Sequence, residues 1–168
     1  AQYKDATKSP LKKKDLRNFK GLDFFPIDSS FIVIAQLKRT PDTPYLAMAT
    51  TTERKPYYRE YGTLSFTLKG KDLTLTLYQS LEEYNDPKYK DYLFLPFTDE
   101  TSGEGSYGGG RYMDVFESTI NSNDTMELNF NNTYNPYCAY NEKYSCPLTP
   151  RKNHLDVAIK AGIKDFKK

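Results

Sequence analysis

Hydrophobic and polar residues alternate along much of the chain beyond residue 31. Leucines and a phenylalanine alternate with serine and threonine over residues 64–68, and leucines alternate with threonines over residues 73–77. A period of two is typical of β-strands that bury one face. Lys69 and Gly70 lie between the two runs and are suited to a turn. The pattern therefore predicts a β-hairpin.

Six further segments show the same alternation or a short run of apolar and aromatic residues. They are residues 31–37, 45–50, 92–97, 111–116, 126–130 and 155–159. Polar, glycine-containing or asparagine-containing turns separate several of them, and no helical period intervenes. Short strands in this arrangement predict an all-β fold, mainly an antiparallel β barrel or sandwich, rather than an α/β fold.

A short helix is predicted near the N-terminus, after Ser9 and Pro10. Serine can cap the helix, proline suits its first position, and Gly21 can follow its last turn. No repeat or linker interrupts the rest of the chain. We therefore expect an N-terminal tail over residues 1–8 and a single β domain over residues 9–168.

Charge and hydropathy limit the classes of partner. The 168 residues include 24 Lys and Arg and 22 Asp and Glu, which are interspersed and give a net charge of +2. This balance gives no reason to expect a nucleic-acid partner, and the absence of an 18-residue apolar run predicts no transmembrane segment. The chain begins Ala1-Gln2, as after signal-peptide removal, so a secreted or periplasmic location is expected, although a trimmed chain would look the same.

The two cysteines, Cys138 and Cys146, have seven residues between them. Structural zinc needs four ligands, and His154 would bring the local cysteine and histidine count to three, while a redox C-x-x-C spacing is absent. A disulfide is the simplest interpretation, with a reactive thiol pair as the alternative. We expect no metal and no cofactor.

Arg111 is the first candidate for a functional side chain. Three glycines precede it and allow a ligand to approach, and its guanidinium offers paired donors to a carboxylate or phosphate. Asp99 and Tyr107 lie close in sequence and could position a polar substrate or act as general acid and base. The alternative is that the glycines form a bulge or tight turn and that Arg111 pairs internally with Asp99 or Asp114.

A second candidate cluster combines asparagines and tyrosines around the two cysteines. Tyrosine offers an apolar ring with a polar tip, and asparagine supplies donors and acceptors, which suits ligand binding. Buried tyrosines that hydrogen-bond to an irregular loop are the alternative. Together with the first cluster, the predicted ligand-binding residues are Asp99, Tyr107, Arg111, Tyr112, Asn131, Tyr134 and Asn135.

Other chemical motifs are weak. Residues 103–108 match G-x-G-x-x-G, but the following residues form a poor helix, so dinucleotide binding is not expected. His154 lies in a charged segment, and no G-x-S-x-G elbow is present, so nucleophilic catalysis has little support.

Two longer blocks carry a family resemblance. These are Y-G-G-G-R-Y over residues 107–112 and N-P-x-C-A-x-N-x-x-x-x-C-P-L over residues 135–148. On these blocks the chain resembles the bacterial family called domain of unknown function 1684, from about residue 9 to residue 166. The resemblance implies a shared fold and no established activity. Asn129 replaces the aspartate usual in relatives, and His154 replaces a common arginine.

Three functions are consistent with these observations. The first is a secreted or periplasmic binding module that holds a small polar or anionic ligand at the glycine-rich loop beside Arg111. The second is an enzyme, a hydrolase or lyase, that uses Asp99, Tyr107 and Arg111. The third is a structural protein of the cell envelope, for which Arg111 would be fully buried and neutralised, with no cavity beside it.

Overall fold

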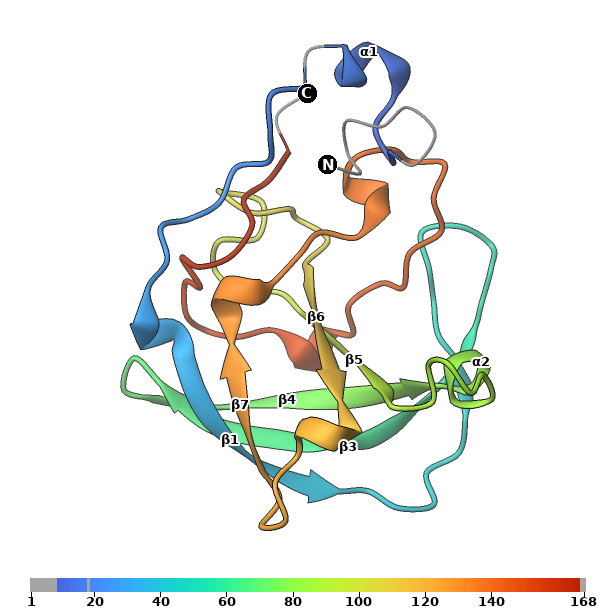
Figure 1. The fold of residues 1–168 in the computed structure, drawn as a ribbon, viewed down its shortest axis with the longest axis vertical. Helices are drawn as coiled ribbons and strands as arrows, with labels where there is room; N and C mark the ends of the chain where they lie inside the picture. Colours follow the sequence, from blue (N-terminus) through green and yellow to red (C-terminus); the bar gives the residue numbers. More distant parts are fainter. Residues whose placement is uncertain (1–8, 18, 167–168) are drawn as a thin grey trace.

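The structure, a computed structural model, describes residues 9–17 and 19–166; the predicted tail over residues 1–8 lies outside this part. Its main elements are strands of one antiparallel sheet with short helical turns between them (Figure 1). In chain order they are α1 (Lys13–Leu16), η1 (Ser29–Phe31), β1 (Ile32–Arg39), β2 (Leu46–Ala47), β3 (Tyr57–Leu68), β4 (Lys71–Ser80), α2 (Leu81–Tyr84), β5 (Tyr92–Phe97), β6 (Arg111–Phe116), η2 (Glu117–Thr119), β7 (Thr125–Asn129), η3 (Phe130–Asn132), η4 (Tyr137–Ala139) and η5 (Arg151–Asn153).

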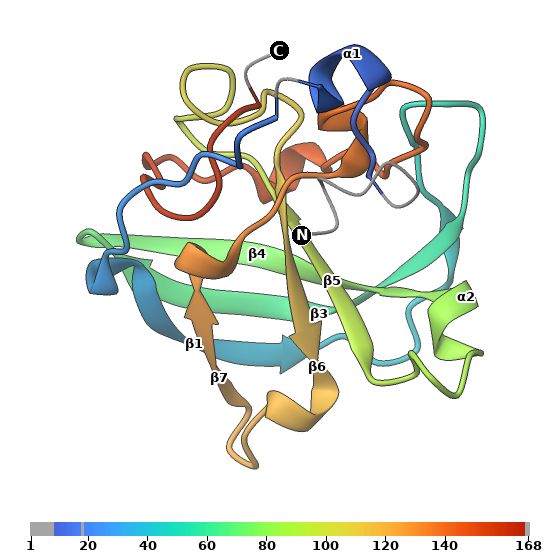
Figure 2. The ribbon, with the colours of Figure 1, turned by 45° about the horizontal axis from the view of Figure 1, so that its top comes forward.

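The sheet has the strand order β6-β5-β4-β3-β1-β7, with β2 added to β3. It curls into a half-barrel, so that the two edge strands β6 and β7 come side by side (Figures 1 and 2). This confirms the predicted all-β, mainly antiparallel fold. None of the described helices is long and apolar enough to cross a membrane.

The predicted hairpin is formed by β3 and β4. Leu64 lies opposite Leu75, and Lys69 and Gly70 both adopt positive φ at the turn, as expected for a tight two-residue hairpin connection. Both strands continue beyond the alternating segments, because a β-bulge between Glu60 and Gly62 lets β3 bend around the core.

Most of the apolar side chains of the sheet fill its inner face and form one large core, which includes Leu64, Leu77, Leu95 and Leu128. A smaller aromatic cluster, with Tyr78, Phe94 and Tyr112 at its centre, lies apart from this core. Because alternate residues of a strand point to opposite faces, β5 and β6 contribute to both clusters. These two strands position the candidate sites described below.

Three predicted elements differ from the structure. The N-terminal helix is a single turn, and the strand expected over residues 45–50 is limited to Leu46–Ala47. The segment 155–159 is not a strand, although Leu155 and Ile159 are buried as its alternation predicts. It lies beside the residues that follow β5: the N–H of Leu155 donates to the carbonyl of Thr98 at 2.8 Å, and the N–H of Glu100 donates to the carbonyl of Val157 at 3.1 Å. Its last residue, Ile159, bonds instead to the side chains of Asp99 and Arg111.

Candidate functional site

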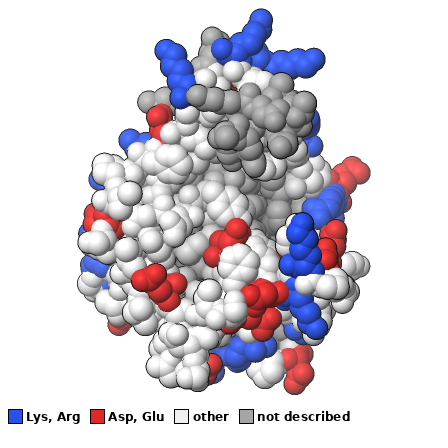
Figure 3. Space-filling view, in the orientation of Figure 1, with Lys and Arg blue, Asp and Glu red and all other residues white. Residues whose placement is uncertain are grey.

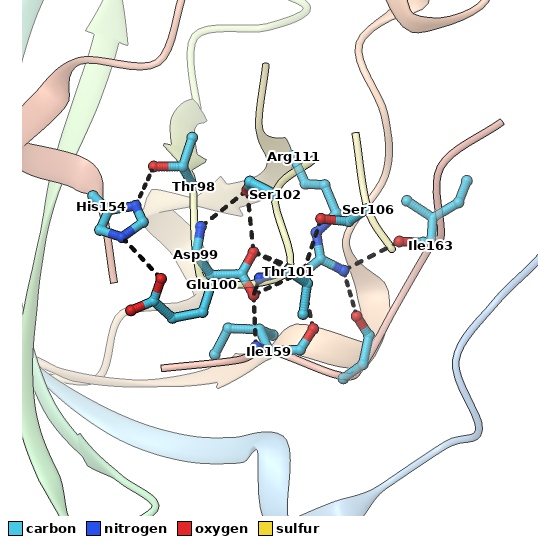
Figure 4. Close-up of polar contacts among 11 residues, drawn as sticks. Thr98, Asp99, Glu100, Thr101, Ser102, Ser106, Arg111, His154, Ile159 and Ile163 are labelled. Carbon is cyan, nitrogen blue, oxygen red and sulfur yellow. Dashed lines mark hydrogen bonds and ion pairs between the residues drawn. The ribbon is translucent and has the colours of Figure 1, made fainter. Parts of the chain in front are cut away.

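Arg111 begins β6 and points into the core, where its side chain is completely buried. Its Nη1 donates to the carbonyls of Ala161 and Ile163 at 2.6 and 3.1 Å, and its Nη2 donates to the carbonyl of Ile159 at 2.9 Å (Figure 4). Burial lowers the pKa of Arg111, and Asp99 opposes this shift. The guanidinium nevertheless remains charged, as arginine does in proteins.

Asp99 is the counter-ion of Arg111, with Oδ1 at 3.3 Å from Nη2 and with its side chain also fully buried. Its other carboxylate oxygen accepts the backbone N–H of Ile159 at 2.6 Å and the hydroxyl of Thr101 at 2.9 Å. The Thr101 hydroxyl also lies 2.8 Å from that of Ser106. The glycine-rich loop is therefore folded around a buried carboxylate (Figure 4).

The internal pairing of Arg111 with Asp99 is the alternative that the sequence left open. The segment 159–163 covers the guanidinium and accepts from both of its terminal nitrogens, whereas the buried Nε has no hydrogen-bond partner among the described residues. Tyr107 does not complete a catalytic group with this pair, since its hydroxyl lies 3.8 Å from Sγ of Cys138. We therefore assign Arg111 and Asp99 a role in holding the fold.

Asn131 has a similar internal role. Its side-chain Oδ1 accepts the N–H of Asp28 at 3.0 Å, and its Nδ2 donates to the carbonyl of Asp28 at 2.9 Å. Nδ2 also donates to Oδ1 of Asn129. The amide thus joins the chain before β1 to the turn after β7.

The other predicted residues meet on the opposite face of β6. Tyr112 follows Arg111 and points away from the core, toward Tyr134. Together with aromatic residues of β3 and β5 and the loop around the cysteines, they line a cavity of about 260 Å³, which we call the tyrosine pocket. Its lining residues are Tyr58, Tyr92, Phe94, Tyr112, Tyr134, Asn135, Pro136, Tyr137, Tyr144, Ser145, Cys146 and Pro147.

Hydrogen bonds fix the tyrosines of this pocket. Tyr134 donates to the Oδ1 of Asp114 at 2.5 Å, and Tyr112 donates to the carbonyl of Pro147. Burial raises the pKa of Tyr92, Tyr112 and Tyr134, and that of Tyr58 to about 12. The rings therefore stay neutral near physiological pH, and their hydroxyls are held in place.

The side chain of Asn135 anchors one wall of the tyrosine pocket. Its Nδ2 donates to the carbonyl of Lys164 at 3.2 Å and to the hydroxyl of Tyr140 at 3.3 Å, and the residue is buried. Its Oδ1 accepts no hydrogen bond from the described residues. Of the seven predicted ligand-binding residues, Tyr112, Tyr134 and Asn135 thus share one cavity.

The two cysteines are free thiols in the structure, which does not show the predicted disulfide. They are nevertheless neighbours, since the N–H of Cys138 lies 3.2 Å from Sγ of Cys146. A hydrogen bond from the Cys146 thiol, with a further one from Tyr107, lowers the pKa of Cys138 to about 7. Cys138 is therefore the more nucleophilic thiol near neutral pH.

Among the residues that the structure describes, one group of side chains could hold a metal ion. The ligand atoms of Glu100, His154 and Asp156 lie within 4.8 Å of one another, and all three residues are exposed. Nδ1 of His154 lies 2.9 Å from the hydroxyl of Thr98, which leaves Nε2 facing the carboxylate of Glu100 at 3.7 Å (Figure 4). The carboxylate of Asp156 lies 3.8 Å from the same nitrogen. The sequence predicted no metal, and these three residues were not grouped from it.

Several structurally important residues were missed from sequence. Asn153, completely buried, bridges β4 and β5, and Tyr58, Tyr92 and Phe94 line the tyrosine pocket. The aromatic residues carried a usable signal: Tyr92 and Phe94 alternate with Leu93 and Leu95 in β5, so a strand with apolar residues on both faces must be covered on both.

The fold and these sites define a small half-barrel β protein with a buried arginine and an aromatic cavity. The chain matches the model of the family described as protein of unknown function (DUF1684) over residues 17–164. It belongs to this family, as its sequence blocks indicate.

A solved structure supports the same relationship. The solution NMR structure of an uncharacterised protein of Haloarcula marismortui is 32% identical, covers 96% of this chain and 85% of its own, and superposes with a TM-score of 0.75. No curated protein matches the chain. The comparisons therefore establish the family and the fold, and they leave the activity to be inferred from the site.

Proposed function

We propose that this protein is a binding module for a small molecule and that the ligand occupies the tyrosine pocket. The observation that carries this proposal is the concentration of seven aromatic rings around a single cavity of about 260 Å³. Ligand sites are typically concave, mainly apolar and supplied with a few fixed polar groups. The volume suits a small ligand with an apolar body, and the pocket replaces the glycine-rich loop as the expected site.

The position of the pocket supports the same proposal. One wall is formed by strands of the sheet, which are rigid, and the other by the irregular segment 134–147, which presents side chains from a loop. Binding residues commonly lie on loops that a scaffold positions. Tyr137 and Tyr144 form the outer part of this loop wall, with ring centroids 5.3 Å apart at an interplanar angle of 69°.

Truncation of this loop wall tests the proposal. A panel of small polar and aromatic compounds is screened by NMR, and a compound that saturates the pocket is titrated against Tyr137→Ala. Removing the ring is expected to weaken binding about tenfold, or about 1.4 kcal/mol, because aromatic contact area is lost. Tyr89→Ala, which removes another exposed tyrosine that does not line the pocket, is the matched control and should bind as wild type does. Equal affinity in both variants, or a panel without any binder, would contradict the proposal.

We further propose that the protein acts in an oxidising compartment, secreted or periplasmic, and that Cys138 and Cys146 form a disulfide there. With oxidised glutathione as oxidant, the Cys138 thiolate attacks the disulfide and releases one glutathione thiolate. Cys146 then loses its proton and displaces the second, leaving the protein disulfide and two reduced glutathione molecules. Closing this short loop would stabilise the fold by about 2.5 kcal/mol in the chain-entropy model.

The expected result is loss of both titratable thiols on incubation with oxidised glutathione. The rate should rise with pH through about 7, the pKa of Cys138, because the thiolate is the attacking species. Mass spectrometry of peptides follows the reaction, and Cys146→Ser, which can proceed only to the mixed disulfide, is the control. Two thiols that persist at pH 8 would exclude the disulfide.

A further inference from the structure

The charges around the tyrosine pocket are mainly negative. Among the described residues that line it there is no lysine or arginine. Asp114 is exposed on the same face of β6 as Tyr112 and accepts the hydroxyl of Tyr134. The face in front of β6 and β7 carries scattered acidic side chains, with lysine and arginine mainly toward its margins (Figure 3).

A second carboxylate is close to this position. The charge of Glu83, in α2, acts on both Tyr58 and Tyr134, which line the pocket. Burial raises the pKa of Glu83, and the carboxylates of Asp114, Glu82 and Asp86 raise it further. Arg54, a nearby cation, is paired with Glu82 at 3.6 Å. Other cations lie farther out, with Lys143 at 5.1 Å from the ring centroid of Tyr144 and Lys90 at 5.3 Å from that of Tyr84. Within the described part of the chain, Asp114 and Glu83 form no ion pair.

From this arrangement we infer that the ligand of the tyrosine pocket is a small organic cation, an alkylammonium group held by tyrosine rings with Asp114 and Glu83 as its counter-charges. The inference rests on the proposed function of the pocket as a ligand site and names the class of ligand.

The chemistry of the pocket fits this class better than the alternatives. The faces of aromatic rings attract cations and tolerate their alkyl groups, and several rings together recognise quaternary ammonium ions. An anionic ligand would meet Asp114 and Glu83 without a described lining cation to offset the repulsion. A metal ion prefers several converging carboxylate or imidazole ligands, whereas the lining is made of rings, an amide, a hydroxyl, a thiol and prolines.

The experiment compares choline with its neutral isostere, 3,3-dimethylbutan-1-ol, by NMR titration of the full chain. The two molecules have the same shape and differ in the charge of the central atom. Choline is expected to bind at least about tenfold more tightly, with the largest shifts at Tyr112 and Tyr134. Increasing the salt concentration should weaken the binding of choline and leave that of the isostere unchanged.

Asp114→Asn is expected to weaken choline binding about fivefold and to leave binding of the isostere unchanged. Asparagine keeps an acceptor for the hydroxyl of Tyr134, so the pocket should persist. Glu83→Gln removes the other proposed counter-charge and provides a second test. The matched control is Asp72→Asn, which neutralises a carboxylate at the start of β4, whereas Glu83 follows the end of that strand. Asp72 accepts a hydrogen bond from Thr67 at 2.8 Å.

Two negative results have different meanings. If the isostere binds as tightly as choline, or if other compounds saturate the pocket and choline does not, the assignment of a cation is overturned and the pocket remains a ligand site. If no compound of either kind perturbs the pocket, the proposed function is overturned together with the inference.

Discussion

Replacing Arg111 by methionine is expected to lower the free energy of unfolding by about 3–5 kcal/mol, as removal of one member of a buried ion pair does. Methionine has a similar length and is apolar, so the loss is mainly electrostatic. The change leaves the Asp99 carboxylate without its cation and the carbonyls of Ile159, Ala161 and Ile163 without their donor. Buried acceptors that lose a partner are costly.

Thermal and urea denaturation followed by circular dichroism measure this effect. For a chain of this size the expected fall in Tm is about 10 °C. Lys12→Ala is the control, because it breaks the exposed pair of Lys12 with Glu142, and exposed pairs contribute about 0–1 kcal/mol. If Arg111→Met unfolds within about 1 kcal/mol of wild type, the guanidinium does not hold the fold, and its role must be sought elsewhere.

A double-mutant cycle separates the ion pair from the carbonyl contacts. Asp99→Asn combined with Arg111→Met should cost less than the sum of the single changes, because each single variant leaves the other charge buried and unpaired. The two side chains are in direct contact at 3.3 Å, so strict additivity would show that Asp99 and Arg111 do not stabilise one another.

Replacing Asn153 by alanine is expected to cost about 3 kcal/mol or more, because three buried backbone groups lose their partner together. The amide Oδ1 accepts the N–H of Thr76 at 2.9 Å, and Nδ2 donates to the carbonyls of Thr76 and Pro96 at 2.9 and 2.8 Å. The described pairing of β4 with β5 is limited to Tyr78 opposite Phe94. Asn153 therefore acts as a peptide group inserted where the two strands separate.

Hydrogen exchange locates the effect as well as measuring it. In Asn153→Ala the amide of Thr76 should lose protection more than the amides of the β3–β4 hairpin, since its acceptor has been removed. The control is Asn121→Ala, an exposed amide that donates to the hydroxyl of Thr125, for which little loss of stability is expected. Unchanged protection at Thr76 would contradict the bridging role.

The alternation of apolar residues predicted most of the fold. It identified the β3–β4 hairpin, which buries one face in a regular ladder, and the strands around residues 92–97 and 111–116, which are rich in apolar and aromatic residues. It failed for residues 155–159, where the same alternation of burial accompanies two backbone hydrogen bonds to residues 98–100 in place of a regular ladder. Side chains distant in sequence, Asp99 and Arg111, bond the N–H and the carbonyl of Ile159, and local sequence does not reveal such partners.

The candidate site was predicted in part for a similar reason. Tyr112, Tyr134 and Asn135 line a common pocket, whereas Arg111 precedes Tyr112 and points to the other face of β6. Adjacent residues in a strand cannot share a site on one face, so assigning strand β6 should have separated them. The pairing of β5 with β6, which brings Phe94 beside Tyr112 with ring centroids 4.6 Å apart, required the structure.

The contacts of the buried guanidinium have a consequence for the order of folding. The hairpin of β3 and β4 joins residues close in the chain and can form early. The carbonyls that receive Arg111 lie 48 to 52 residues away from it, and a charge leaves water only when its partners are present. We therefore expect the interior to lose its water only after residues 159–163 have packed against Arg111. Before that step, the incomplete half-barrel is expected to retain water at its centre.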